Sequence, residues 1–306
     1  NIGMYPYYAK SLLESEGGGM EKAGVYVGNI TQIEFGPQVS IQTYLAYLFS
    51  GILHKFGCRF RPYEKITGST DAAIEAGLQI FVCAFAGEMN LKKAIDEVLH
   101  LFEKIEVNPG NKPKVAIFGD IYVRDNPVMN QDLVRFIERS GGEVVVTPYN
   151  EYAKIVSSSY FKIWMKRLQI ADVILFKALL AAMEFIEGNY YPVFEPFIGK
   201  PASSDSGDIE KKLAQFYLRY EQVGETNDNI LKINHIMEKY PDLSFFVHTS
   251  PAFCCPSLTT ESFCRKIEET FGVPVVNIIY DGTKTFRNGV ILPYLKYPRK
   301  LETNQT

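Results

Sequence analysis

The sequence predicts an α/β fold in which the strands of the sheet run parallel. Residues 114–123 contain a short apolar run that is typical of a buried strand, and residues 143–147 form a second strand. Between them, Asn126 and Pro127 fit the N-cap and first position of a helix. A strand, a helix and a strand in this order form a βαβ unit, for which parallel strands are the default. The pattern returns later in the chain, with strands at 243–249 and 273–280 around a helix at 259–271, and a last helix at 284–295.

The first hundred residues are mainly helical in pattern. Residues 5–16 form an amphipathic segment that Gly17, Gly18 and Gly19 end. A short strand is predicted at 23–30. A long apolar helix follows at 38–56, and then helical residues at 70–105 with breaks near Gly77 and Gly87.

Residues 108–113 form the clearest linker, because proline and glycine at this density stop helices and strands alike. We therefore expect an N-terminal α/β and helical lobe at 1–110, truncated at its start, and a C-terminal α/β lobe at 111–306. A helical insertion at about 151–240 divides the second lobe, since strand signals are almost absent there. Its predicted helices cover 152–168, 171–191, 207–222 and 227–240.

Composition excludes several classes of protein. The chain has 306 residues, 46% of them hydrophobic, and a net charge of -3, which leaves no basic footprint for nucleic acid or for a membrane surface. The five cysteines include no C-x-x-C pair, and no signal peptide opens the chain, so we expect a reducing cytoplasm. The apolar stretches 39–56 and 173–186 carry too many polar residues for membrane spans and are predicted to be buried helices.

The segment Ser250-Pro-Ala-Phe-Cys-Cys-Pro256 is the strongest candidate for chemistry, since it joins a predicted strand to a predicted helix. A thiolate there could hold a metal cluster. In an extended segment Cys254 and Cys255 point to opposite sides, so both are not expected to ligate one iron. By composition alone the two are better interpreted as small apolar loop residues. Cys264 is predicted to lie in the core, and Cys58 and Cys83 to be structural.

A second candidate is the segment 119–127, which follows a buried strand and opens the predicted helix. Arg124 could hold a carboxylate or phosphate, and Asn126 with the free amides of the helix start would favour an anion. Asp120 and Asp125 are equally well explained as turn and capping residues. His248, at the end of its strand, is better interpreted as a hydrogen-bonded structural histidine than as a base or ligand.

Three segments in this order resemble one family: Gly119-Asp-Ile-Tyr-Val-Arg-Asp-Asn-Pro127, Pro251-Ala-Phe-Cys-Cys-Pro256 and Ile279-Tyr-Asp-Gly282. The segment 61–64 and the glycine-led helix at 224–237 occur in matching order. Together they resemble 2-hydroxyacyl-CoA dehydratases and their activase-related relatives, including double-cubane cluster proteins. The match is to the dehydratase-like portion of these oxygen-sensitive iron–sulfur proteins and covers most of the chain.

The resemblance implies two flavodoxin-like or Rossmann-like lobes with helical additions. It places a cluster-ligating cysteine at Cys254, whereas Cys255 fills a position that need not be cysteine. The opening residues Asn1-Ile-Gly-Met-Tyr5 fit the part of a G-P-C-R-x-G-x-Y motif that follows its cysteine, so that thiol would precede Asn1 and the chain would be a piece of a longer protein. With one recognisable ligand, we expect this chain alone neither to hold a stable cluster nor to turn over.

In function, the resemblance implies a lyase or its activase component. An ATP-dependent activator would supply a low-potential electron to an iron–sulfur cluster, and the cluster would pass it to the thioester carbonyl of an acyl-CoA. Two alternatives stay open. One is a cluster-free α/β module that binds a small anion or CoA near Arg124 and Asn126, and the other is a docking domain of a larger multidomain protein.

Overall fold

The computed structural model describes residues 5–25, 37–204, 207–222 and 224–299. Contacts divide the chain into two compact units, Asn1–Tyr44 and Leu45–Thr306. The linker at 108–113 has no regular structure, as expected, and lies inside the second unit. Whether its two sides are separate lobes stays a prediction.

The first unit contains helix α1 (Tyr5–Glu16), which confirms the helix expected at 5–16, and a short 3-10 turn η2 (Met20–Lys22). Of the strand expected at 23–30, residues 23–25 have no regular structure and residues 26–30 lie outside the described residues. Helix α2 (Pro37–Phe60) begins in this unit and continues into the second.

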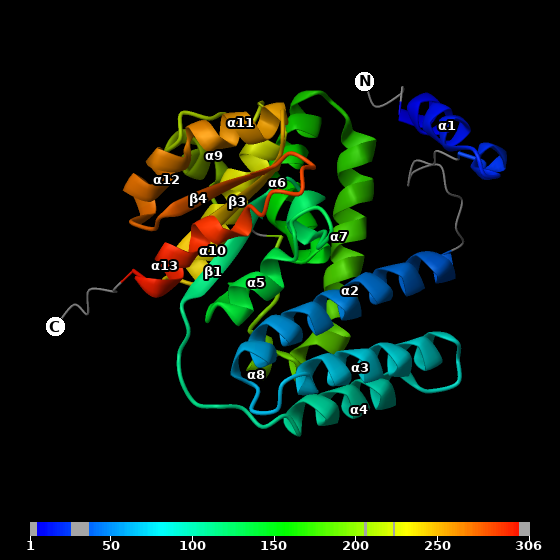
Figure 1. The fold of residues 1–306 in the computed structure, drawn as a ribbon. Helices are drawn as coiled ribbons and strands as arrows, with labels where there is room; N and C mark the ends of the chain where they lie inside the picture. The colour runs from blue at the N-terminus through cyan, green and yellow to red at the C-terminus, as the bar shows by residue number, and fades with distance from the viewer. Residues whose placement is uncertain (1–4, 26–36, 205–206, 223, 300–306) are drawn as a thin grey trace. The chain divides into compact units, whose positions relative to one another are not determined.

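Helices α2, α3 (Ser69–Phe85) and α4 (Leu91–Glu103) share one hydrophobic core in the second unit (Figure 1). The break expected near Gly77 is wrong, because this glycine lies buried inside α3. A Cβ there would stand 3.3 Å from Leu53 and 3.6 Å from Val98, so glycine permits close packing of the three helices. The break near Gly87 is confirmed, since this residue has a φ of 81° between α3 and α4.

A four-stranded parallel sheet forms the centre of the second unit and confirms the α/β prediction. The strand order is β2-β1-β3-β4, the order of flavodoxin-like sheets. The part of the chain that the structure describes contains this one sheet, and residues 45–110 within it form helices, turns and loops, with a single bridge between Glu64 and Val107 and no strand. The strands are β1 (Lys114–Gly119), β2 (Glu143–Val145), β3 (Phe245–Pro251) and β4 (Val275–Tyr280).

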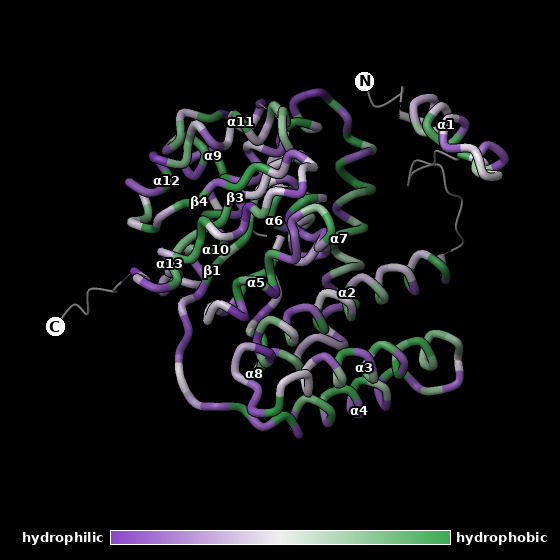
Figure 2. Tube along the Cα trace, viewed as in Figure 1, coloured by the Kyte–Doolittle hydropathy of each residue, from purple (hydrophilic) through white to green (hydrophobic). Residues whose placement is uncertain are grey.

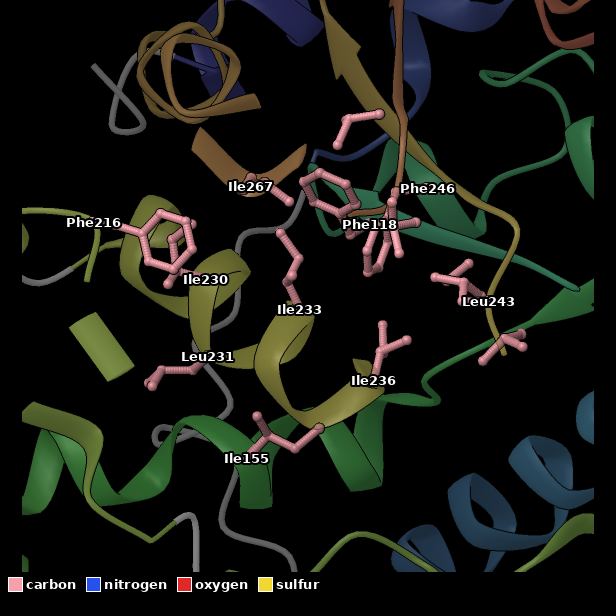
Figure 3. Close-up of a cluster of buried hydrophobic side chains, with 14 of the residues drawn as sticks. Phe118, Ile155, Phe216, Ile230, Leu231, Ile233, Ile236, Leu243, Phe246 and Ile267 are labelled. Carbon is pink, nitrogen blue, oxygen red and sulfur yellow. The ribbon is translucent and has the colours of Figure 1, made fainter. Parts of the chain in front are cut away.

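Helices cover both faces of the sheet, and side chains alternate between them with the period of two that a strand requires. Ala116 and Phe118 of β1 join Phe246 of β3 in one core with α10 (Glu225–Lys239). Figure 3 shows Phe118 and Phe246 beside Ile233 and Ile236 of this helix. Val115 and Ile117 face the opposite core, together with α5 (Leu133–Arg139) and α13 (Leu292–Lys296). Apolar residues therefore run along the strands (Figure 2).

Strand β1 and helix α5 differ from the predicted bounds. The strand ends at Gly119 instead of Val123, and the helix begins at Leu133 instead of Asn126. The Asn126 side chain accepts hydrogen bonds from the amides of Val128 (3.0 Å) and Met129 (3.1 Å) and closes a turn. Asp132 then adopts a left-handed φ of 57°, so the helix cannot begin before it.

The insertion between β2 and β3 is helical, as predicted. Its helix expected at 207–222 ends early, because Tyr217 adopts a left-handed φ of 58°. The expectation that residues 173–186 are buried is wrong: Ile174, Leu175 and Phe185 are 65%, 64% and 74% exposed. The remaining helices here are α6 (Tyr149–Lys166), α7 (Ile170–Tyr190), η6 (Tyr191–Val193), α8 (Glu195–Ile198) and α9 (Ile209–Ala214).

The helix expected at 259–271 is two helices, α11 (Cys255–Ser262) and α12 (Cys264–Phe271), and it begins four residues early. The last predicted helix is a 3-10 turn, η7 (Asn288–Ile291), followed by α13. No helix of the described residues is both long and apolar enough to cross a membrane.

Candidate metal-ligating site at the carboxyl edge of the sheet

The carboxyl ends of β1 and β3 lie side by side, and the chain leaves them in opposite directions. From β1 it continues to β2 on one side, and from β3 it continues to β4 on the other. Ligands of open α/β sheets bind in the crevice at such a switch point. Both segments singled out in the sequence, 119–127 and 250–256, begin at this place.

Asp120 directly follows β1 and is fixed by one backbone hydrogen bond and two hydrogen bonds to its side chain. Its amide donates to the carbonyl of Thr249 in β3 (2.9 Å). Its Oδ1 accepts hydrogen bonds from the amides of Tyr122 (3.0 Å) and Val123 (2.8 Å). The turn role expected for Asp120 is therefore confirmed, and it holds the carboxylate at the edge of the sheet.

Cys254 follows β3 through a tight turn and forms the N-cap of α11. Its amide donates to the carbonyl of Pro251 (3.4 Å), and Phe253 adopts a φ of 64° while 91% of it is exposed. Cys254 is half-buried and makes no side-chain cap hydrogen bond, whereas Cys255, the first residue of the helix, is exposed. The turn thus aims one thiol toward the crevice and the next into solvent.

Glu225 completes the group, and sequence analysis did not predict it. It is the first residue of α10, after Gly224 with a φ of 143°, and its Oε1 accepts a hydrogen bond from the Ile121 amide (3.5 Å). Thr226 donates to the carbonyl of Pro256 (3.0 Å), which ties the start of α10 to the start of α11. The available signal was an acidic residue directly after the glycine that opens a helix within the segment 224–237.

The ligand atoms of Asp120, Glu225 and Cys254 all lie within 4.8 Å of one another, and each residue is half-buried. Burial raises the pKa of Glu225, and the negative charge of Asp120 raises it further. A cation between the two carboxylates would relieve that repulsion. One thiolate with two carboxylates is a donor set that suits a single divalent transition-metal ion such as Zn²⁺ or Fe²⁺.

Arg124 and Asn126, the two residues predicted to hold an anion, do not face an open site in the structure. Arg124 is 2% exposed: its Nε donates to Asp125 (2.8 Å), Nη2 donates to the Thr147 carbonyl (3.3 Å), and its guanidinium lies 5.0 Å from the ring centroid of Tyr152. Asn126 uses its side-chain oxygen to close the turn before α5. In this conformation the two side chains maintain the loop beside the edge instead of facing an open site.

Beneath the edge lies a buried polar layer. Asp228 accepts hydrogen bonds from the hydroxyls of Tyr152 (3.1 Å) and Tyr160 (3.2 Å), and burial raises its pKa to about 6. Lys232 donates to the carbonyl of Ile117 (2.9 Å), and burial holds its pKa well below the usual range.

His248 is 1% exposed, its Nδ1 lies 3.0 Å from Asn277 Oδ1, and burial lowers its pKa to about 4. The hydrogen-bonded structural role expected for it is confirmed.

An iron–sulfur cluster, which the family resemblance implies, is usually held by about four thiolates. Among the described residues, the group at the carboxyl edge contains one thiol, that of Cys254. Cys264 is buried in the core as predicted; its Sγ lies 3.3 Å from Asn277, and burial raises its pKa to about 12. Cys58 is buried on α2, as the structural assignment expected, and burial raises its thiol pKa. The Asp120–Glu225–Cys254 group therefore supplies one thiolate, which is too few to hold a cluster by itself.

Comparison of the chain with models of known protein families, with curated proteins and with solved structures finds no match.

Proposed function

We propose that this edge ligates a metal and that the chain is part of an iron–sulfur protein resembling 2-hydroxyacyl-CoA dehydratase or its activase-related homologues. The observation that carries the proposal is the convergence of Cys254 with Asp120 and Glu225 at the switch point. Cys254 supplies one ligand, and the remaining ligands of a cluster come from outside the described residues. The free cysteines fit a reducing cytoplasm.

The wider activity in this proposal is ATP-coupled transfer of low-potential electrons to the cluster or to an acyl-CoA. Its partners are an ATP-dependent activator and an acyl-CoA substrate. From the described residues we assign only the local roles. Asp120 and Glu225 place negative charge beside the thiol, and the turn 251–254 fixes the thiol at the carboxyl edge of the sheet.

The alternative, a cluster-free module that binds a small anion or CoA, has less support at its predicted residues. The Arg124 guanidinium is buried against two tyrosine rings, at 5.5 Å from Tyr149 and 5.0 Å from Tyr152. An anion would reach it only if the loop moved. A docking role within a larger protein would use the same fold without a ligand at the edge.

Anaerobic reconstitution of the gene product that contains this chain, with Fe²⁺ and sulfide, tests the proposal. We expect bound iron, labile sulfide and visible charge-transfer absorption, all lost in Cys254→Ser and retained in the matched control Cys255→Ser. Iron without labile sulfide would instead indicate a mononuclear ion on the three residues. Absence of bound iron from the unmodified protein would contradict metal ligation at this edge.

A further inference from the structure

A cavity lies beside the amino-terminal ends of β1 and β2, away from the switch point. It has a volume of about 410 Å³, and its lining includes Lys114 and Glu143, the first residues of β1 and β2. Three consecutive residues at 144–146 also line it, so the cavity faces the free edge of β2 and not one face of the sheet. Its volume falls within the range of small-molecule sites.

Four cations converge on this cavity, and three of them have carboxylate partners. Lys55 pairs with Glu151, Arg59 with Glu143 (3.2 Å), and Lys114 with Asp242 (2.5 Å). Lys239, the last residue of α10, is the fourth.

Lys239 forms no ion pair of its own with the described residues, although the Glu151 carboxylate, which pairs with Lys55, attracts it electrostatically. Its ammonium donates to the carbonyl of Lys200 and lies 5.7 Å from the ring centroid of Tyr240. Among the residues that the structure describes, no carboxylate stands within ion-pair distance of it. Burial, and then the nearby charge of Lys55, lower its pKa to about 8, so it is still mainly protonated at neutral pH. A bound anion would supply the missing counter-charge in a partly desolvated place.

The other charged groups of the cavity are held in place before any ligand arrives. Lys55 is 7% exposed, and its ammonium also lies 3.4 Å from the hydroxyl of Tyr191. Glu143, the partner of Arg59, accepts a further hydrogen bond from Tyr63 (2.6 Å). Preorganised groups lose little entropy when a ligand binds.

The rest of the lining is apolar and includes Val145, Phe197 and Ile198. Such a wall favours a ligand that carries hydrocarbon beside its charge. Inorganic ions alone would leave this surface uncovered.

We propose that this cavity binds a small organic anion, with its phosphate or carboxylate head on Lys239 and a short apolar tail against Phe197 and Ile198. The head group pairs directly with the one cation of the cavity for which the described residues provide no ion pair. The tail displaces water from the apolar wall. This site is separate from the metal-ligating edge, and its ligand does not depend on the identity of the metal there.

Calorimetric titration of the chain at neutral pH tests the proposal, with butyl phosphate, butyrate and inorganic phosphate as probes. We expect saturable binding of butyl phosphate or butyrate, and the stronger of the two identifies the head group. Inorganic phosphate should bind more weakly because it lacks a tail. Lys239→Met should weaken binding about tenfold or more, while Lys239→Arg retains it. Lys92→Met, an exposed lysine on α4, is the matched control and should change nothing.

Absence of saturable binding by either organic probe would overturn the proposal. Equal binding to the unmodified chain and to a folded Lys239→Met variant would do the same. If Lys239→Met does not fold, Lys239→Gln replaces it, because glutamine removes the charge and keeps a donor for the Lys200 carbonyl. Unchanged binding in that variant would also refute a head-group site on Lys239.

Discussion

Gly119 allows the two central strands to approach closely at the candidate site, and Gly119→Ala tests that arrangement. The residue ends β1 with a φ of 117°, where a side chain is strained. An added Cβ would stand 2.1 Å from the carbonyl oxygen of Thr249 and 2.9 Å from the His248 ring. Backbone atoms cannot rotate away, so β1 and β3 would have to separate at their carboxyl ends.

The expected cost has three parts. The left-handed backbone costs about 1–3 kcal/mol for a residue with a side chain. The steric overlap adds about 1–3 kcal/mol, and loss of the hydrogen bond from the Asp120 amide to Thr249 adds about 1 kcal/mol. We therefore expect Gly119→Ala to lower the free energy of unfolding by about 3–7 kcal/mol and to move Asp120 away from Cys254.

Gly110→Ala is a matched control, since Gly110 has a φ of 146° but no atom within 4 Å of the added Cβ. It should cost only the backbone part, about 1–3 kcal/mol. Urea unfolding followed by circular dichroism measures both variants. Costs that agree within about 1 kcal/mol would refute the argument from close strand approach.

Three further perturbations address buried charges, each measured by urea unfolding. Because burial lowers the pKa of His248 from 6.5 to about 4, native stability that is present above pH 6.5 is lost as the pH falls toward 4. His248→Gln should remove about 3 kcal/mol of that loss. If the free energies of unfolding of the variant and the unmodified chain differ by the same amount at every pH, His248 is not the group responsible. Asp228 behaves in the opposite way: its pKa is raised from 3.8 to about 6, so its ionisation costs stability above pH 6 and nothing below 3.8. The change in the free energy of unfolding caused by Asp228→Asn should therefore be more stabilising by about 3 kcal/mol at alkaline pH than at pH below 3.8. An equal change at both pH values would exclude a desolvated carboxylate. Lys154→Met leaves Glu187 buried without its cation and should cost about 3–5 kcal/mol, most of it recovered by adding Glu187→Leu; no recovery would argue against a buried pair.

Local patterns predicted the elements of the sheet better than the turns around them. Apolar runs located all four strands, since a strand of a parallel sheet is buried on both faces and must be continuously apolar. The start of α5 was wrong by several residues because Asn126 closes a turn with its side chain, and the left-handed Asp132 precedes the helix. Both features depend on single backbone conformations that residue type only weakly indicates.

Periodicity carries information about burial in an amphipathic helix, whereas burial was predicted poorly where the pattern is uniformly apolar. Helix α4 buries Ala94, Val98 and Phe102 on one face, as its periodicity indicates. Helix α7 is apolar on all sides, and periodicity cannot say which side meets the core. The exposed Ile174 and Phe185 show that composition alone overestimates its burial.

The candidate site was predicted in part. Cys254 and the segment after β1 could be singled out because loops that follow strands carry the ligands of α/β proteins. Glu225 was not predicted, because it follows a helical insertion of many residues and only the folded chain brings it to Asp120. Arg124 was assigned to the anion from its position in the loop, whereas its burial depends on Tyr149 and Tyr152 from α6.

The sequence by itself determined an α/β protein with parallel strands, a helical insertion and a cysteine at a strand end, because these follow from local periodicity and residue type. Only the tertiary structure decided that β1 and β3 are neighbours, that Asp120, Glu225 and Cys254 meet between them, and that Lys239 faces a cavity without a carboxylate partner among the described residues. The physical reason is that strand order and helix docking depend on contacts between residues far apart in the chain. Such contacts leave no local periodic pattern.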